Sequence, residues 1–270
     1  METDLEKMID LARKVRIHVL DMVNSAQSSH IGASYSIVEI LVTLYSRILK
    51  INPNDPNNAN RDKFLLSKAH GSCALYAILA ESNFFPLDVL KKYYLDGGIL
   101  PGHLDKEAVP GIEHSMGSLG HGLPFGAGLA YANKIDHNKG QIYVLIGDGE
   151  CNEGTIWESA MFAGHHKLDN LTVIVDYNKI QSFGRVEEIM NLEPFGQKWT
   201  AFNWNVHEID GHDFEQLIKA LESKSTKPKV IIANTIKGKG VSFMEDKLEW
   251  HYKSTNPEQY EHALKELNKK

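Results

Sequence analysis

The sequence is poor in cysteine, with only Cys73 and Cys151 among its 270 residues. Two cysteines so far apart exclude both a disulfide framework and a cysteine-based metal site. No apolar run reaches the roughly 20 residues that a membrane-spanning helix needs, and the charged N-terminal segment lacks a signal-peptide core. We therefore expect a cytoplasmic protein without a membrane partner.

An excess of one charge is also missing. The 29 Lys and Arg residues nearly balance the 35 Asp and Glu residues, for a formal net charge of -6. This mild acidity argues against nucleic acid as the main partner. A chain of this length with 42% hydrophobic residues can bury a large core. Because no linker, repeat or low-complexity run interrupts it, we expect residues 1–270 to form a single domain.

The segment from Gln141 to Gly184 organises the rest of the chain. Its first β-branched run, Ile142 to Ile146, predicts a buried strand that ends in Gly147-Asp148-Gly149. Glycines at this position allow a sharp turn and the close approach of a ligand. A helical pattern from Glu153 to Lys167 follows.

A second buried run, Leu171 to Val175, ends in Asp176-Tyr177-Asn178. The two runs form a βαβ unit, and adjacent parallel strands lie about 4.8 Å apart. Asp148 and Asn178 can therefore reach one ion, and a carboxylate with an amide oxygen suits Mg²⁺ bound to phosphate. The alternative is that both side chains only cap nearby backbone groups. A predicted strand precedes both Gly147-Asp148-Gly149 and Asp176-Tyr177-Asn178, and 28 residues separate Gly149 from Asn178. This pattern favours the metal–phosphate site over simple capping.

Strands alternate with helices along the remaining sequence. The patterns predict helices over 5–23, 37–49, 123–135 and 214–221, another beginning near residue 73, strands over 64–67, 206–209 and 230–233, a loop over 24–32 and a short solvated helix in 254–270. This alternation predicts an α/β fold, a doubly wound parallel sheet with helices on both faces.

Histidines recur in the predicted loops. They are His30, His70, His103, His114, His121 and His251, most of them close to glycines. A single loop histidine is more often a structural brace than a functional group. Several beside a metal–phosphate turn favour function, because neutral imidazoles can donate hydrogen bonds to phosphate or to a developing alkoxide.

The segments GDGECNEG and DYNKI resemble the thiamine diphosphate signature of the transketolase family. The segments SSHIG, LSKAH, LPGH, MGSLGHG and KGKGVSFME also resemble loops of that family, and the resemblance covers roughly residues 5 to 255. It implies the thiamine diphosphate-binding fold, with thiamine diphosphate and Mg²⁺ (or Ca²⁺ or Mn²⁺) as cofactors.

The resemblance also implies roles for individual residues. His30 would face the substrate and the thiazolium, His70 the diphosphate and substrate, and His103 the substrate and intermediate. Together with Glu153, which would join the charged network near the cofactor, these histidines form the implied catalytic set. Asp148, Asn178 and the Ile180 carbonyl would bind the metal. The further implied cofactor contacts are Gly117, Ser118, Leu119, Gly149 and His251.

The resemblance covers only the diphosphate-binding part of a full transketolase. It implies a separate C-terminal subunit with the pyrimidine domain and its activating glutamate, in a heterotetramer built on a homodimer core. The complex would transfer a two-carbon ketol unit between sugar or sugar-phosphate substrates. Ile31, His121 and Tyr252 replace the usual proline, glutamine and glycine, which leaves substrate specificity open. The alternatives are a subunit that decarboxylates 2-oxo acids, as a dehydrogenase first subunit does, and a non-catalytic regulatory subunit.

Overall fold

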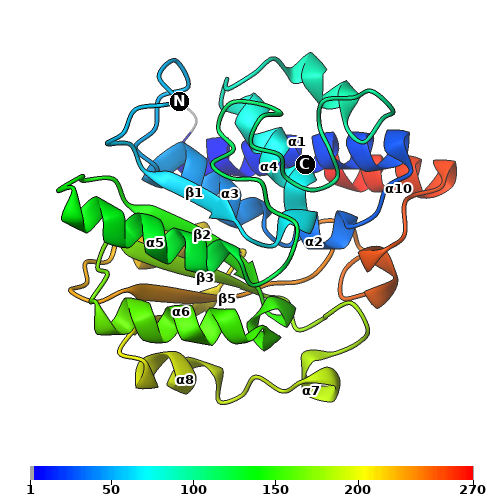
Figure 1. The fold of residues 1–270 in the computed structure, drawn as a ribbon. Coiled ribbons are helices and arrows are strands. Elements are labelled where there is room, and N and C mark those ends of the chain that lie inside the picture. The colour runs from blue at the N-terminus through cyan, green and yellow to red at the C-terminus, as the bar shows by residue number, and fades with distance from the viewer. Residues whose placement is uncertain (1–2, 270) are drawn as a thin grey trace.

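The computed structural model describes residues 3–269, and a five-stranded sheet forms its centre (Figure 1). All neighbouring strands are parallel, in the order β1-β2-β3-β5-β4. The strands are β1 (Lys63–Leu66), β2 (Ile142–Gly147), β3 (Leu171–Tyr177), β4 (Asn205–Asp210) and β5 (Lys229–Asn234). The predicted parallel sheet is thus confirmed.

The central strands are continuous apolar runs because the sheet is covered on both faces. Every residue of β3 is buried, as are the first five of β2. The two strands are neighbours, with Gly147 paired to Asp176. This register brings the turns after β2 and β3 to the same edge of the sheet, as the sequence predicts.

Helices surround the sheet on both sides. They are α1 (Asp4–Ala26), α2 (Ile31–Tyr35), α3 (Val38–Thr43), α4 (Ser72–Glu81), α5 (Gly122–Ile135), α6 (Gly154–His165), α7 (Val186–Ile189), α8 (Phe195–Ala201), α9 (Phe214–Glu222) and α10 (Pro257–Leu267). Figure 1 shows α5 and α6 side by side in front of the sheet. Helices α3 and α9 pack together on the other side, which confirms the doubly wound arrangement.

Two expectations for the helices need correction. The 24–32 segment is not all loop, because α1 continues to Ala26 and α2 begins at Ile31. Helix α10 is not simply solvated, since it packs against α1 and buries Ala263 and Leu267. The Tyr260 hydroxyl also donates a hydrogen bond of 2.8 Å to Asp21.

The stretch Ile31–Ile48 bears on the expectation that no apolar run is long enough to span a membrane. By length and composition it could cross a membrane, but 78% of it is buried inside the fold. It comprises α2, α3 and a π-helical turn over Leu44–Ile48. A buried core segment passes the same test, so the stretch is weak support for a membrane span.

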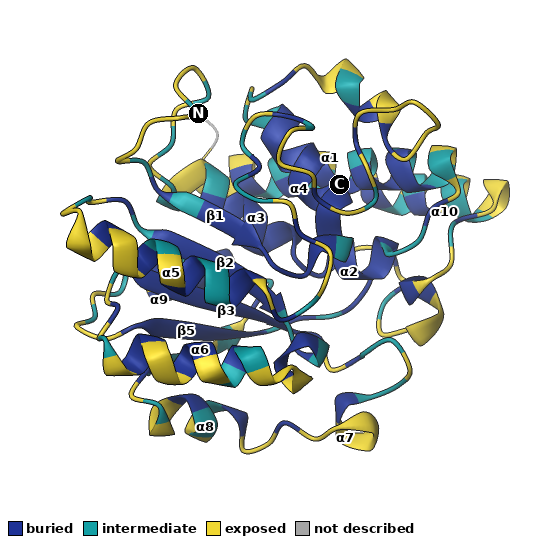
Figure 2. Cartoon of the chain, in the orientation of Figure 1, coloured by how far each residue is buried: buried dark blue, intermediate teal, exposed yellow. Residues whose placement is uncertain are grey.

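The outward surface of α5 and α6 carries exposed apolar side chains. Figure 2 shows buried strands behind these helices and exposed residues along their outer faces. Tyr131, Ile135, Met161 and Phe162 are the large apolar residues there, each more than a third exposed. We call these four residues the α5–α6 apolar surface.

Candidate functional site

A cavity of about 130 Å³ lies where β2, β3 and β5 end. Its walls include Lys68, His70, Leu119, Gly147 to Glu150, Asn178, Ile180 to Phe183, Lys237 and His251. A larger groove of about 1030 Å³ lies at the opposite end of the strands, around Lys229, and contains none of the predicted site residues. The smaller cavity is therefore the candidate site, since it gathers the predicted chemistry.

The three predicted metal ligands meet at this cavity. Asp148 is buried, and its two carboxylate oxygens accept hydrogen bonds of 2.6 Å from the Gly149 and Lys179 N–H groups. Asn178 Oδ1 accepts a hydrogen bond of 3.0 Å from the Ile180 N–H. Both side chains therefore do cap nearby backbone N–H groups, as the alternative interpretation of the sequence expected. Burial, followed by the charge of Asp176, raises the pKa of Asp148 to about 6, so this carboxylate favours a nearby cation.

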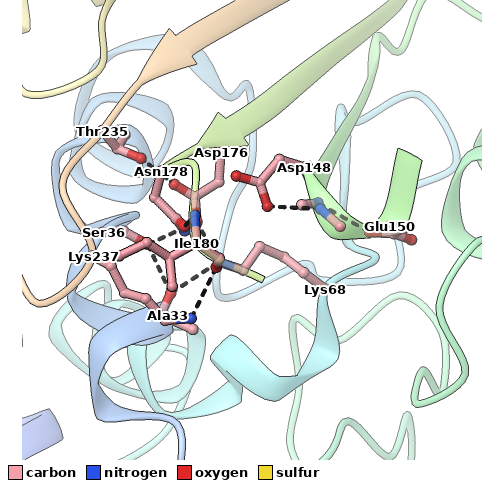
Figure 3. A network of polar contacts seen from close by, with 12 residues as sticks. Ala33, Ser36, Lys68, Asp148, Glu150, Asp176, Asn178, Ile180, Thr235 and Lys237 are labelled. Atoms are coloured by element: carbon pink, nitrogen blue, oxygen red, sulfur yellow. Dashed lines mark hydrogen bonds and ion pairs between the residues drawn. The ribbon is translucent and has the colours of Figure 1, made fainter. Parts of the chain in front are cut away.

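Asp176 forms the centre of a buried polar network (Figure 3). It accepts hydrogen bonds from Lys68 Nζ, Thr235 Oγ1, Ser36 Oγ (2.7 Å) and Asn178 Nδ2 (3.0 Å). Burial alone would raise the pKa of the Asp176 carboxyl, but the Lys68 ammonium and these hydrogen bonds lower it. The Asn178 amide nitrogen thus binds Asp176, while its oxygen accepts from the Ile180 N–H and keeps a second lone pair for a cation.

Lys237 is a second buried lysine, reaching the site from the segment after β5. Its Nζ donates a hydrogen bond of 3.0 Å to the Ile180 carbonyl and lies 2.7 Å from His251 Nδ1. Burial and the nearby Lys68 lower the pKa of Lys237 to about 8. The carbonyl predicted to bind the metal thus already faces a cationic group.

Four of the predicted histidines form a cluster beside the cavity. The His30 ring centroid lies 5.3 Å from that of His70, 6.0 Å from His103 and 5.2 Å from His251. Burial, followed by the charge of His103, lowers the pKa of His30 to about 4, while burial and Lys237 lower that of His251 to about 3. Burial also holds the pKa of His70 well below its usual range. These three imidazoles are therefore neutral near pH 7.

Local structure explains how His30 and His103 are held. His30 has a φ of 74° at the start of α2, in the left-handed region, and its N–H donates a hydrogen bond of 2.9 Å to the His251 carbonyl. The loop that carries His103 is fixed from α4, where Ser72 Oγ donates to the Gly102 carbonyl at 2.7 Å. Tyr76 donates to the Pro101 carbonyl at 3.0 Å.

Other predicted residues lie outside this cluster. His114 stacks on Phe125 with ring centroids 4.1 Å apart, as a loop brace would. His121 is exposed at the start of α5. Glu153 is exposed at the start of α6, and Gly117 and Ser118 are also exposed, whereas Leu119 lines the cavity. The roles implied for Glu153 and these loop residues stay predictions.

Sequence reasoning missed Lys68, Glu150, Asp176, Gln181 and Lys237 as parts of the site. Lysine and glutamate usually lie in solvent, so their types gave no indication of burial. The one available signal was position: Lys68 directly precedes Ala69-His70, and Asp176 stands two residues before Asn178. A charged residue at the end of a buried strand is a reasonable candidate for a buried network.

The chemistry of the cavity fits a divalent cation with a diphosphate group. Among residues 3–269, Gln181 Nε2 is a buried donor without a hydrogen-bond partner. A Cβ on Gly149 would lie 3.2 Å from Gln181 Cγ, so glycine keeps this wall open. The Lys68 and Lys237 ammonium groups and the orphan amide suit anionic oxygens, while Asp148, Asn178 and the Ile180 carbonyl suit a hard cation.

Fold and site together define an α/β protein that binds a metal–phosphate group at the carboxyl ends of its strands. Residues 7–266 match the model of the family described as transketolase, thiamine diphosphate binding domain. A 6-deoxy-6-sulfo-D-fructose transketolase subunit of Clostridium sp. (strain MSTE9) is 44% identical, over 98% of both chains. An apulose-4-phosphate transketolase subunit of Actinobacillus succinogenes is 45% identical, over 98% of this chain and 96% of that protein.

Solved structures agree with this similarity. The transketolase of Campylobacter jejuni superposes with a TM-score of 0.92 at 33% identity, and the match covers 98% of this chain but 43% of that one. The chain belongs to the transketolase family. It is a thiamine diphosphate-dependent, transketolase-like transferase subunit that corresponds to the N-terminal domain of the full-length enzymes.

Proposed function

We propose that this chain is the N-terminal subunit of an enzyme that transfers a two-carbon ketol unit between sugar-type substrates. The observation that carries the proposal is the histidine cluster directly beside the Asp148–Asn178–Ile180 wall, in which His30, His70 and His251 are neutral near pH 7. Uncharged imidazoles suit the hydroxyl and carbonyl groups of a polyhydroxylated substrate. Two relatives are named for sugar substrates, sulfofructose and apulose-4-phosphate, which supports the same class.

The site residues divide into four groups in this proposal, and His70 belongs to two of them. Asp148, Asn178 and the Ile180 carbonyl bind Mg²⁺. Lys237, His251, His70 and the Gly149 N–H hold the diphosphate, and Gly117, Ser118 and Leu119 contact the aminopyrimidine. When bound, thiamine diphosphate would supply a nucleophilic carbon, and its thiazolium ring would take up the electron pair released by C–C cleavage. His30, His70 and His103 orient the substrate and donate hydrogen bonds where its oxygen becomes negative, while Glu153 joins the charged network near the cofactor.

A second subunit completes the site in this proposal. The α5–α6 apolar surface is exposed in the isolated chain, and exposed apolar patches commonly mark protein interfaces. The chain spans about two fifths of the length of full-length transketolases, and two relatives are named as subunits. The partner we propose is a C-terminal transketolase-like subunit with the pyrimidine domain, in a heterotetramer with a homodimer core. We also propose that residues 1–270 form one domain and that the complex is cytoplasmic.

The enzymatic alternative is a subunit that decarboxylates a 2-oxo acid. It shares the cofactor, so the cofactor site does not separate the two functions. The His30, His70 and His103 loops favour ketol transfer, because three convergent imidazoles suit several hydroxyl groups better than one small 2-oxo acid. A regulatory subunit without catalysis is less well supported, because the full metal wall is retained.

The test is an activity assay of the purified chain with thiamine diphosphate and Mg²⁺. A ketose donor with an aldose acceptor and a 2-oxo acid are offered separately, each with and without the candidate partner subunit. We expect ketol transfer only when both subunits are present. Release of CO₂ from the 2-oxo acid would favour the alternative. Full turnover by this chain alone, unchanged by the partner, would contradict the need for a second subunit.

A further inference from the structure

Glu150 is a buried carboxylate beside the cofactor site that the functions above do not use. It lies in the turn Gly149–Asn152, between β2 and α6, and is 1% exposed. Its side chain points away from the Asp176 network (Figure 3). A buried carboxylate without a direct ion pair needs several hydrogen-bond donors to remain in place.

These donors come from three separate segments of the chain. Glu150 Oε1 accepts hydrogen bonds from Ser67 Oγ and from the Gly120 N–H at 2.9 Å, and Oε2 accepts from the Gly147 N–H at 3.1 Å. Ser67 Oγ in turn accepts from the Gly122 N–H at 3.0 Å. One carboxylate therefore links the end of β1, the entrance to α5 and the turn after β2.

The backbone of Gly120 is held at both its N–H and its carbonyl. Its N–H binds Glu150, and its carbonyl accepts a hydrogen bond of 2.8 Å from Thr155 Oγ1 in α6. Gly120 has a φ of +83°, and a Cβ there would lie 2.6 Å from Thr155 Oγ1. Only glycine fits this conformation and this close contact, so the anchor is specific.

The segment before Gly120 is otherwise loosely attached. Met116 exchanges two hydrogen bonds with Leu104, at 3.0 and 3.1 Å, which fixes the other end. Between these anchors, residues 117–119 make no backbone hydrogen bond within the described residues 3–269. The position of these three residues therefore depends on the two ends, and Glu150 holds one of them.

We propose that Glu150 is a positioning residue that fixes the 117–120 segment at a set distance from the Gly147–Gly149 turn. The segment is the proposed aminopyrimidine contact and the turn is the proposed diphosphate contact, so the inference rests on the proposed function. Glu150 thus sets the spacing between the two ends of the bound cofactor. It acts through the Gly120 and Gly147 N–H groups that it holds.

The test compares Glu150→Ala, Glu150→Gln and Ser67→Ala with the wild-type chain of residues 1–270. Ser67→Ala removes the hydroxyl that donates to Glu150 and that accepts from the Gly122 N–H. It leaves the hydrogen bond from the Gly147 N–H to Glu150 in place. Glu215→Ala, an exposed carboxylate on α9, is the matched control. Hydrogen exchange of the 117–122 peptide is measured without cofactor. Calorimetry then measures the affinities for thiamine diphosphate and for inorganic pyrophosphate, each with Mg²⁺.

We expect Glu150→Ala to speed exchange of the hydrogen-bonded Gly120 and Gly122 N–H groups in the 117–122 peptide at least tenfold and to weaken thiamine diphosphate binding by a similar factor. Pyrophosphate affinity should stay within about twofold, because Asp148 still holds the Gly149 and Lys179 N–H groups. Glu150→Gln keeps one acceptor oxygen, so its exchange rate and its thiamine diphosphate affinity should lie between those of Glu150→Ala and the wild type. Ser67→Ala should act in the same direction as Glu150→Ala.

Equal losses for both ligands, or unchanged exchange in a folded variant, would overturn the proposal. A wild-type chain that binds neither ligand, alone or with the partner subunit, would instead contradict the proposed function. In that case the exchange measurement still decides whether Glu150 holds the segment.

Discussion

Asp148 is the only carboxylate among the three proposed metal ligands, and it is buried next to a second carboxylate, Asp176. Replacing it with alanine removes the charged ligand and leaves the diphosphate without part of its counter-ion. We expect Asp148→Ala to lower thiamine diphosphate affinity in the presence of Mg²⁺ at least tenfold, or about 1.4 kcal/mol. Calorimetry on the folded variant checks this, with the exposed Asp96→Ala as control. Unchanged affinity would remove Asp148 from the metal site.

His103 is proposed to act on the substrate and not on the cofactor. His103→Ala should therefore reduce turnover by the reconstituted enzyme about tenfold or more, because a hydrogen bond to developing charge is lost, while cofactor affinity changes little. His114→Ala is the matched control, since that histidine lies in a loop but stacks on Phe125. Should both variants keep wild-type turnover, His103 would be a loop brace like His114.

The burial of His30 predicts how stability depends on pH. The folded chain keeps His30 neutral down to about pH 4, whereas the unfolded chain protonates it near 6.5. As pH falls through this window the unfolded state takes up the proton first, so the folded state loses stability. Relative to His30→Asn, the wild-type chain should lose on the order of 1 kcal/mol of unfolding free energy between about pH 7 and 4.5, after allowance for partial exposure.

Urea unfolding of both proteins at several pH values measures this difference. Asparagine is the chosen replacement because it tolerates the left-handed backbone and does not titrate. A stability difference that stays constant over the window would show that His30 is not held neutral by the fold.

At the scale of the elements, helix α5 provides a matched pair of glycines. A Cβ on Gly126 would lie 2.5 Å from Val144 Cγ2 of β2, whereas one on Gly128 would meet no atom of residues 3–269 within 4 Å beyond its chain neighbours and the backbone of its own helix. Gly126→Ala should therefore cost about 1–3 kcal/mol of unfolding free energy, because the helix must move off the sheet. Gly128→Ala should instead stabilise the chain by about 0.5–1 kcal/mol through helix propensity.

Chemical denaturation of the two variants checks the pair. Because the two substitutions should change the unfolding free energy in opposite directions, a general effect of alanine in this helix cannot produce both results. Equal stabilities for both variants would show that α5 is not in close contact with β2 at Gly126.

At the scale of the whole molecule, the core of the fold was predictable from hydrophobic periodicity. The runs that became β2 and β3 are short and β-branched, and the stripe in α1 places Val15, Val19 and Val23 at helical spacing on the buried side. The short helices α7 and α8 were not predicted, because a few residues between loops show no clear period. The packing of α10 on α1 was missed because a tail with many charges resembles a solvated helix.

The candidate site was predictable where residue type and strand-end position agree, as at Asp148 and Asn178. Parallel strands necessarily bring such residues to one edge. The partners of the site residues were not predictable, because they depend on contacts between distant segments. Lys237 meets Ile180 across 57 positions of sequence, and Ser67 meets Glu150 across 83. No local pattern contains these pairings.

The left-handed backbone of His30 implies an exchange of stability for function. A side chain in this region is strained by roughly 1–2 kcal/mol, which glycine would avoid. The chain nevertheless places an imidazole there, where its ring is the hub of the histidine cluster. His30→Gly should therefore fold at least as stably as His30→Ala even though both lack the ring. The chain thus keeps a ring at a position where the backbone alone would favour glycine.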